Sequence, residues 1–523
     1  MKFITARVLK NLLKIDFIVS LNFFCEVTHT NAKRIRGFYM ESLWKKELNH
    51  SGKNRYAVQK KTENTHRDVI IIGAGMAGML TAYYLKEQGK NVLVLEAEKI
   101  ASGQTEKTTA KITSQHGVKY STLIKQIGKE KAKLYAKANE EAIEEYAKLI
   151  EKEGIRCDFK RVPSYLYTFQ KQAILKQEAK AAVELGIDAE FTMEVELPFS
   201  VAGAVRFQNQ AQFFPLKFLQ HICTNIEVWE NTKVKSIRGK KVITEKGELT
   251  AEHIVVATHY PILNAPGFYF LRQHQERSYV LALSGCPKIE GMYYGIDSNG
   301  LSFRQAGEYL LLGGSSHRTG EHQATDAYDF LVDAANRYFP QCKEVTRWSA
   351  QDCMPHDGIP FIGKYSVFMP HLYVATGFQK WGMTSSMVAA QMLRDEICGL
   401  ENPYRGLFSP QRLHIRAGFR NLAVDTDIST DGMFRGIFHR PNITEDALAY
   451  GQGRIVSIKG KRYACYRDEN GLLHKISARC PHMGCELSWN SDEKSWDCPC
   501  HGSRFDMDGK LLDNPSKRDA CVK

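Results

Sequence analysis

A cluster of cysteines and histidines near the C-terminus constrains the fold of this chain more than any other feature. The stretches CPHMGC (480–485) and CPCHGS (498–503) place four cysteines and two histidines within 22 positions. The pattern is Cys480-x-His482, then fifteen residues, then Cys498-x-x-His501, so each of two segments offers one thiolate and one imidazole. Both groups are metal ligands, so the fold has to bring these two segments together.

Two kinds of metal centre use two cysteines and two histidines. Zinc fingers commonly place C-x2-4-C before H-x3-5-H, which is not the order found in this chain. A Rieske 2Fe-2S cluster takes two thiolates on one iron and two imidazoles on the other. The spacing therefore favours a Rieske cluster over zinc, with Cys480, His482, Cys498 and His501 as the ligands.

The surrounding residues predict a small all-β domain. From about residue 436, short alternating apolar stretches are separated by turns at KG (459–460) and ENG (469–471). Residues 436–523 resemble Rieske domains, in which two further cysteines tie the cluster loops together by a disulfide. The resemblance assigns that disulfide to Cys485 and Cys500.

The same resemblance implies two positions that adjust the reduction potential of the cluster. Ser503 stands where Rieske proteins place a hydroxyl donor, whereas Phe505 stands where high-potential members usually have tyrosine. Rieske potentials span about −150 to +300 mV, and hydrogen bonds to the cluster help to set them. Because one donor is missing, we expect a potential below that of the respiratory Rieske proteins.

A nucleotide-binding unit lies near the other end of the chain, in DVIIIGAGMAGMLTAYYLKEQGKNVLVLEAEK (68–99). The apolar run 69–72 predicts a buried parallel strand, 76–89 a helix, and 91–96 a second strand. The turn GAGMAG (73–78) then allows a pyrophosphate to approach the backbone at the helix N-terminus. Glu96 ends the second strand, where a carboxylate can accept hydrogen bonds from ribose hydroxyls.

Two later segments favour FAD over NAD as the nucleotide. GELTAEHIVVATHYP (247–261) predicts a strand that ends in a turn at Ala257 and Thr258. HLYVATGFQKWGMTSSMVAAQMLRDEI (371–397) predicts another strand, followed by Gly377 and a helix that begins at Gly382. Three separate pieces suit one long ligand, and no second complete GxGxxG unit is present for a nicotinamide. We therefore expect the reducing equivalents to come from a substrate that the protein oxidises, and not from NAD(P)H.

These stretches, with ASGQTEKTTAKIT, GGSSHRTG and PHDGIPFIGKY, resemble the FAD-dependent oxidoreductases of the D-amino-acid oxidase type across residues 40–420. The resemblance implies an α/β Rossmann-type FAD-binding domain, in segments of about 66–160, 200–265 and 345–400, with an inserted antiparallel-sheet (α+β) substrate domain. Val234 would lie near the adenine, and Thr105, Thr108 and Thr109 are weaker candidates near the flavin. The expected FAD contacts are Gly73, Ala74, Gly75, Met76, Ala77, Gly78, Glu96, Thr105, Thr108, Thr109, Val234, Ala257, Thr258, Gly377, Trp381, Gly382, Met383 and Thr384.

The substrate site has the weakest sequence signal, and no catalytic residue is identified. Oxidation of an amine by a flavin needs a neutral nitrogen, an aimed C–H bond and a pocket, but it does not require a dedicated base. The polar residues at strand ends and loops that can face a substrate are His259, His317, Arg318, His356 and Asp357.

The composition excludes other classes of protein. With 523 residues, 43% of them hydrophobic, the chain can bury two or three domain cores, which excludes general disorder. The formal net charge is +13, but residues 1–65 carry +8 of it, and no basic run interleaved with aromatics follows them. Nucleic acid is therefore not an expected partner.

Residues 1–65 are expected to be a leader and N-terminal arm. The leader begins like a secretory signal, but Asp16 and Asn22 interrupt its apolar part, and a membrane span needs about 20 predominantly apolar residues. One hypothesis is that the native chain starts at Met40, and the similarity of MESLWKKE to the usual start of the oxidase group supports it.

Nine cysteines outside the cluster have no pattern, and most are expected to be ordinary buried thiols. They are Cys25, Cys157, Cys223, Cys286, Cys342, Cys353, Cys398, Cys465 and Cys521. The expected location is the cytoplasm, where thiols are normally kept reduced. The disulfide beside the cluster would then depend on burial for protection.

The predicted function joins a two-electron flavin to a one-electron cluster. The chain is expected to oxidise a small amine or amino acid and to pass electrons through the Rieske cluster to an unidentified external acceptor. The reverse direction, from cluster to flavin, stays open. Two other functions also stay open: a redox-sensing or electron-transfer protein without substrate turnover, and a membrane-associated, quinone-linked dehydrogenase attached through the leader.

Overall fold

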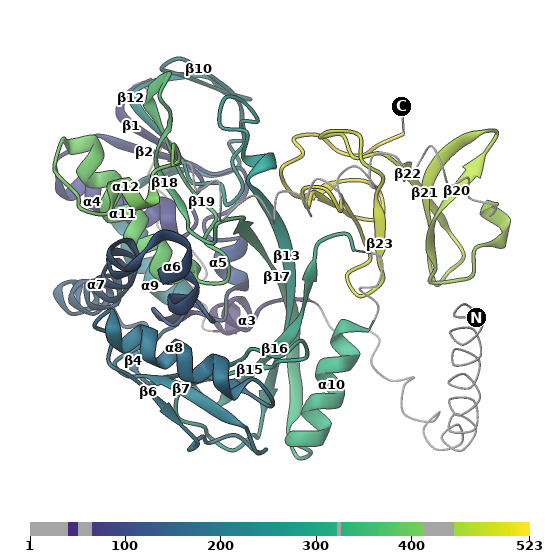
Figure 1. Cartoon of the computed structure of the whole chain (residues 1–523). Coiled ribbons are helices and arrows are strands. Elements are labelled where there is room, and N and C mark those ends of the chain that lie inside the picture. The colour runs from purple at the N-terminus through teal and green to yellow at the C-terminus, as the bar shows by residue number, and fades with distance from the viewer. Residues whose placement is uncertain (1–39, 51–64, 322–325, 413–443, 523) are drawn as a thin grey trace, which may run out of the picture. The chain divides into compact units, whose positions relative to one another are not determined.

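A computed structural model describes residues 40–50, 65–321, 326–412 and 444–522 (Figure 1). The expectations for residues 1–39, and the proposed start of the Rieske domain at 436, lie outside the described residues. No helix among the described residues is long and apolar enough to cross a membrane.

An eight-stranded sheet contains the predicted nucleotide-binding unit. Strand β1 (His66–Ile72) lies between β2 (Val92–Leu95) and β12 (Gly247–Val256), and β12 also pairs with β19 (Met369–Thr376); all three pairings are parallel. These strands end directly before Gly73, Glu96, Ala257 and Gly377, so four predicted cofactor segments start at one edge of the sheet. The remaining strands are β9 (Glu227–Trp229), β10 (Val234–Arg238), β11 (Lys241–Thr244) and β18 (Phe361–Ser366).

Helices pack on this sheet and on each other. Helix α4 (Met76–Glu87) follows β1, helix α11 (Gly382–Cys398) follows β19, and the two pack against one another and the long helix α7 (Lys129–Glu153) (Figure 1). Nine of the twelve residues of α4 are buried, which explains why its sequence is apolar on nearly every side. The other helices are α3 (Leu43–His50), α5 (Gln104–Lys107), α6 (Tyr120–Ile127), α8 (Gln172–Glu184), α9 (Pro215–Ile222), α10 (Ala327–Tyr338) and α12 (Arg405–Phe408).

A second eight-stranded sheet confirms the expected inserted domain. Its order is β17-β13-β16-β15-β14-β5-β7-β6, and every pairing is antiparallel except β14 with β5. Helix α10 packs on β13 and β16 (Figure 1). The strands are β5 (Ser164–Thr168), β6 (Ala189–Thr192), β7 (Gly203–Phe207), β13 (Gln273–Ser284), β14 (Met292–Gly295), β15 (Ser302–Ala306), β16 (Tyr309–Arg318) and β17 (Lys343–Pro355).

The borders of the inserted domain differ from the expected ones. Strands β7 and β17 belong to the second sheet, although they fall in segments (200–265 and 345–400) that were expected to bind FAD. Strand β7 is buried along nearly its whole length, and buried and less buried residues alternate along most of β17. Strands of the first sheet have similar patterns, so the local sequence does not tell which sheet a strand joins. A small sheet of β3 (Lys111–Ile112), β8 (Ala211–Gln212) and β4 (Lys160–Arg161) lies outside both large sheets.

The C-terminal region is all-β, as predicted. Its first sheet is β20 (Gly453–Ile458), β21 (Lys461–Arg467) and β22 (Leu473–Ser477). Its second sheet is β23 (Ser488–Asn490), β24 (Ser495–Asp497), β25 (Arg504–Phe505) and β26 (Leu511–Asp513). The segments with the predicted cluster ligands precede β23 and follow β24, so the second sheet brings them together.

Two disulfides are present among the described residues. Cys485 is bonded to Cys500, and Cys286 is bonded to Cys342. The general expectation of ordinary thiols is therefore wrong for Cys286 and Cys342, which are 56 residues apart in sequence and carry no local spacing signal. The described cysteines that remain free are Cys157, Cys223, Cys353, Cys398, Cys465, Cys480, Cys498 and Cys521.

Buried charges join the C-terminal domain to the inserted sheet. Arg277 of β13 forms an ion pair with Glu493, and Arg504 of the C-terminal domain binds the same carboxylate at 2.5 Å. The side chains of all three are at most 6% exposed. Burial alone would raise the pKa of Glu493, but the two guanidinium groups hold it at about 2.

Replacement of Glu493 by glutamine tests this contact. The carboxylate stabilises the fold above its ordinary pKa of 4.5, and this contribution is lost as the pH falls toward 2. We expect Glu493→Gln to lower the free energy of unfolding by about 3 kcal/mol near pH 7, because it removes the ion pair of Arg277 with Glu493 and one of the three carboxylates that bind Arg504. The difference from wild type should shrink below pH 4.5 in urea denaturation.

Glu469→Gln is a matched control, because Glu469 pairs with Lys494 at the surface and both are nearly half exposed. An exposed pair contributes little. A constant difference between wild type and Glu493→Gln from pH 7 to pH 3 would contradict the assigned pKa.

Candidate functional site

A cavity of about 470 Å³ lies at the edge where the four parallel strands end. It collects residues from all three predicted nucleotide-binding pieces. Thirteen of the eighteen predicted contacts line it: Gly73, Gly75, Met76, Ala77, Glu96, Thr105, Thr108, Val234, Ala257, Thr258, Gly377, Gly382 and Met383.

The glycine-rich turn has the close contacts that its sequence predicts. A Cβ on Gly78 would lie 2.0 Å from the carbonyl oxygen of Gly73, so only glycine lets α4 pack this closely on the turn. Gly73 has a φ of +107°, and a Cβ there would lie 2.5 Å from the oxygen of Ala257. Gly78 does not line the cavity, but it places the N-terminus of α4 beside it.

Glu96 lines the cavity and is held by backbone amides. Its Oε2 accepts a hydrogen bond from the amide of Ala74 at 2.8 Å, and its Oε1 accepts one from Glu98 at 2.9 Å. Burial raises the pKa of Glu96, and the amide hydrogen bonds act in the opposite direction. The carboxylate oxygens have further lone pairs, so this geometry suits ribose hydroxyl groups as ligands. Ala74 supports Glu96 and does not line the cavity.

Three other predicted contacts lie outside the cavity lining. Trp381 stacks on the ring of His116 with centroids 5.0 Å apart. Thr384 donates a hydrogen bond to the carbonyl oxygen of Thr113 at 3.0 Å, and Thr109 accepts one from Arg304 through its carbonyl oxygen. All three residues therefore contact other parts of the protein rather than the cavity.

The cavity also has a lining that the sequence did not predict. Lys380 lies between two carboxylates, with Nζ at 3.1 Å from Oε2 of Glu276 and 3.2 Å from Oδ2 of Asp352. Burial would lower the pKa of Lys380, but the two carboxylates raise it, so the ammonium is retained. The other unpredicted lining includes Lys107, Gln351, Gln379 and residues 511–517 of the C-terminal domain.

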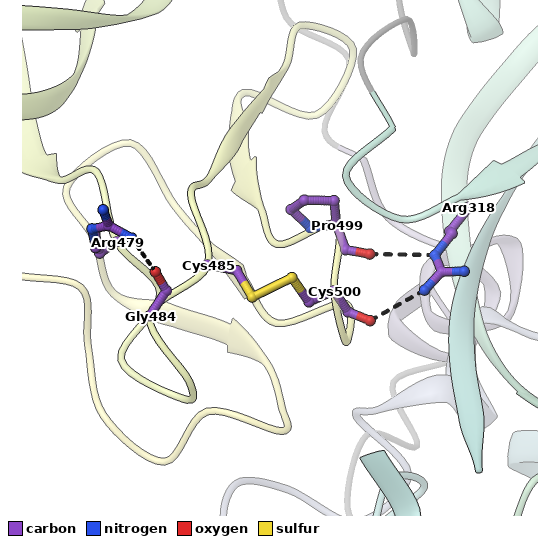
Figure 2. Close-up of a disulfide and its surroundings, with 6 residues drawn as sticks. All are labelled: Arg318, Arg479, Gly484, Cys485, Pro499 and Cys500. Atoms are coloured by element: carbon purple, nitrogen blue, oxygen red, sulfur yellow. Dashed lines mark hydrogen bonds between the residues drawn. A yellow bond between two sulfur atoms is a disulfide. The ribbon is translucent and has the colours of Figure 1, made fainter. Parts of the chain in front are cut away.

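The five substrate-site candidates do not converge in the structure. His259 alone among them lines the cavity. Arg318 donates hydrogen bonds to the carbonyl oxygens of Pro499 and Cys500, both at 3.3 Å (Figure 2). Asp357 is bound by the guanidinium of Arg412. The remaining two are ring-stacked: His317 on Tyr279 and His356 on His274.

The two predicted cluster loops have equivalent backbone geometry. In each, a glycine four residues after the first cysteine donates its amide to that cysteine's carbonyl oxygen at 2.9 Å: Gly484 to Cys480, and Gly502 to Cys498. Both glycines have a positive φ, of +82° and +79°. The disulfide between Cys485 and Cys500 joins the loops, and Arg479 closes the first one by donating to the oxygen of Gly484 (Figure 2).

The predicted ligands fit a four-donor metal centre. The thiols of Cys480 and Cys498 are hydrogen-bonded to each other, and the rings of His482 and His501 lie with centroids 5.0 Å apart. Nδ1 of His482 is buried without a hydrogen-bond partner among the described residues, while its Nε2 contacts Oδ1 of Asn264 at 3.0 Å. This leaves one ring nitrogen available for a metal and fixes the other.

A different set of sulfurs is also close together. The sulfurs of Cys485, Cys498 and Cys500 lie within 4.8 Å of one another. Two of them are bonded to each other and cannot act as thiolate ligands. The arrangement therefore leaves Cys480 and Cys498 as the two thiolates.

Ser503 contacts the cluster site directly. Its hydroxyl hydrogen-bonds to the Cys480 thiol and lowers the pKa of that cysteine, although the larger effect comes from Cys498. The amide of Ser516 donates to the Ser503 hydroxyl oxygen at 2.9 Å, which leaves the hydroxyl proton directed elsewhere. Phe505 is fully buried and has no hydroxyl to offer.

Comparison with protein families decides the class of the larger part of the chain. Residues 68–396 match the DAO model, described as FAD dependent oxidoreductase. This chain belongs to that family. Residues 442–522 match the Rieske [2Fe-2S] domain. The chain is thus an FAD-dependent oxidoreductase with a C-terminal Rieske domain, and its cofactors are FAD and a 2Fe-2S cluster.

Curated relatives include a protein with matching length. The chain is 36% identical to YhfW of Bacillus subtilis (strain 168), which is named as a Rieske 2Fe-2S iron-sulfur protein, over 87% of this chain and 92% of YhfW. It is 23% identical to the gamma-glutamylputrescine oxidoreductase of Escherichia coli (strain K12), over 66% of this chain and 87% of that protein.

A solved structure has the same fold in the FAD-dependent part. Glycine oxidase from Geobacillus kaustophilus has a TM-score of 0.59 at 19% identity, and the match covers 67% of this chain and all of that chain. At this identity the likeness shows the fold alone.

Glu96→Ala tests the role of the carboxylate at the end of β2. The loss of a charged acceptor should cost about 1.5–3 kcal/mol of binding free energy, or roughly a 10- to 150-fold rise in the Kd for FAD. Fluorescence titration of flavin-free protein measures this constant. Glu252→Ala, at an exposed position of β12 outside the cavity, should leave it unchanged. Equal Kd values for both variants would contradict the assignment.

Ser503→Ala tests the hydroxyl contact at the cluster. A hydrogen bond to a charged sulfur contributes up to about 3 kcal/mol, which for one electron corresponds to at most roughly 130 mV. We expect a lower midpoint potential in a redox titration followed by electron paramagnetic resonance. Ser457→Ala in β20 is the control. Equal potentials in wild type and Ser503→Ala would show that the Ser503 hydroxyl does not raise the potential of the cluster.

Proposed function

We propose that this chain oxidises a small amine or amino acid at its FAD and passes the electrons through the Rieske cluster to an external acceptor. The observation that carries the proposal is the shared cavity wall: residues 511–517 of the Rieske domain line the same cavity as the glycine-rich turn. Two redox sites that share a wall in one chain suit electron exchange between them. The sequence similarity to gamma-glutamylputrescine oxidoreductase supports an amine or amino acid as the substrate class.

The two cofactors supply different electron chemistry. Bound FAD can accept two electrons with a hydride from a substrate C–H bond, whereas a 2Fe-2S cluster carries one electron at a time. The described residues prepare the site for this chemistry. Lys380 keeps its positive charge beside the cavity, because the carboxylates of Glu276 and Asp352 lie on either side of its ammonium. His259 is held neutral because burial lowers its pKa.

The residue assignments are part of the same proposal. We assign the predicted contacts that line the cavity, with Glu96 at the ribose, to FAD, and Cys480, His482, Cys498 and His501 to the cluster. We also propose that the domains are approximately 66–420 and 436–523, with β7 and β17 placed in the substrate domain. The proposed location is the cytoplasm, where the buried positions of Cys485 and Cys500 would protect their disulfide from reducing thiols.

An anaerobic reduction experiment tests this function. Purified protein with both cofactors is mixed with amino acids, N-methyl amino acids and polyamines, while flavin absorbance and the resonance of the reduced cluster are recorded. We expect one compound to bleach the flavin and then to produce the cluster signal. Bleaching by dithionite alone would contradict substrate oxidation and favour a redox-sensing or electron-transfer protein.

Cys498→Ser is the matched control for the electron route. This variant should lose the cluster signal but keep the bleaching by the same compound, because Cys498 does not line the FAD cavity. A substrate that reduces the flavin of the wild type but never its cluster would contradict the proposed route while leaving the oxidase activity intact.

A further inference from the structure

Residues 511–517 of the Rieske domain form a wall of the FAD cavity although they lie more than 400 residues after the glycine-rich turn. This segment comprises β26 and the residues that follow it. It has no GxGxxG pattern or other nucleotide-binding signal, and it lies within residues 442–522, which match the Rieske domain rather than the FAD-dependent family. Its position in the cavity is therefore a property of this domain combination.

Asn514 hydrogen-bonds the segment to the residues that follow β12. Its side-chain amide donates hydrogen bonds to the carbonyl oxygens of Tyr260 at 3.0 Å and Thr258 at 3.3 Å. Gln275 of β13 donates in turn to the carbonyl oxygen of Asn514 at 3.0 Å. Because Thr258 also lines the cavity, these bonds attach the segment at the rim of the cofactor site itself.

Asp513 anchors the segment from the other side. Arg504 binds its Oδ2 at 3.0 Å, and Gln104, another cavity residue, donates to its Oδ1 at 3.2 Å. Burial would raise the pKa of Asp513, but neighbouring cations lower it, so the carboxylate stays charged and neutralised by its partners. The segment can therefore lie beside an anionic ligand without adding an uncompensated negative charge.

The same segment reaches the cluster site. The amide of Ser516 donates to the hydroxyl oxygen of Ser503, which bonds to the Cys480 thiol. Gln275, which holds Asn514, also donates to the carbonyl oxygen of His501 at 2.7 Å. One short stretch thus contacts both cofactor sites through direct hydrogen bonds.

We propose that residues 513–517 are part of the FAD-binding site, so that bound FAD and the docked Rieske domain stabilise one another. The inference rests on the assignment of the cavity to FAD in the proposed function. The expected ligand is an anionic dinucleotide, and the segment contributes one cationic residue, Lys517, to the cavity lining. Thermodynamic linkage makes the effect reciprocal: contacts that tighten FAD binding must also stabilise the docked segment when FAD is present.

Lys517 and Lys510 provide a matched pair of variants. Lys517 lines the cavity, and among the described residues no hydrogen bond or ion pair of its side chain would be lost on its removal. Its charge acts on the ring of His482, so the cluster resonance is recorded for this variant as well. Lys510 is an exposed lysine of the same domain that lies just outside the lining. Replacement of either by alanine removes one positive charge from the Rieske domain.

The first test measures FAD affinity in full-length, cluster-loaded protein from which the flavin has been removed. We expect Asn514→Ala to raise the Kd for FAD at least about tenfold and Lys517→Ala to raise it several-fold, with Lys510→Ala equal to wild type. The cluster resonance reports whether each variant is folded. If Asn514→Ala does not fold, the Kd of Lys517→Ala for FAD tests the inference alone. Kd values for the folded variants within twofold of wild type would overturn the inference.

The second test uses wild-type protein and measures amide hydrogen exchange with and without FAD. We expect FAD to slow exchange in residues 511–517 and to leave strands β20–β22 of the same domain unchanged. Equal exchange in residues 511–517 in both states would also overturn the inference. If the protein binds FAD but exchange is unchanged, the inference fails and the proposed function stands. If the protein binds no FAD, the inference and the proposed function both fail.

Discussion

Four parallel strands that end at one edge of a sheet determine where the chemistry of this chain takes place. Strands β1, β2, β12 and β19 come from three distant parts of the sequence, and their ends place Gly73, Glu96, Ala257 and Gly377 around one cavity. The approach of α4 to this edge is close because Gly78 has no side chain. The remaining parts of the molecule are arranged around this edge: the inserted sheet, the buried Lys380 and the Rieske domain.

The Rieske domain is held against the oxidoreductase by charges and amides that are removed from water. Arg277 of β13 meets Glu493, and Gln275 of the same strand meets the cluster loop and the segment after β26. A Cβ on Gly502 of the cluster loop would lie 2.6 Å from Cβ of Gln275, so the two domains are in close contact there. A buried charge without its partner is costly, so this interface favours one docked arrangement.

Much of this site is predictable from sequence because its signals are local. The turn at Gly73–Gly78, the carboxylate of Glu96 and the spacing from Cys480 to His501 each express constraints that act within a few residues. Trp381 and Thr384 lie in the right segment, yet they contact other parts of the protein rather than the cavity, because helix rotation about its axis is set by packing. The contribution of residues 511–517 has no local signal, since it depends on the docking of one domain on another.

Flash photoreduction of the protein with both cofactors bound determines whether flavin and cluster exchange electrons within one chain. A short light pulse with a soluble photoreductant reduces the flavin, and the absorbance of the cluster is followed in time. Transfer within one chain gives first-order kinetics with a rate constant that does not change with protein concentration. An apparent rate constant proportional to protein concentration, or a cluster that stays oxidised while the flavin is reduced, would contradict electron exchange within the chain.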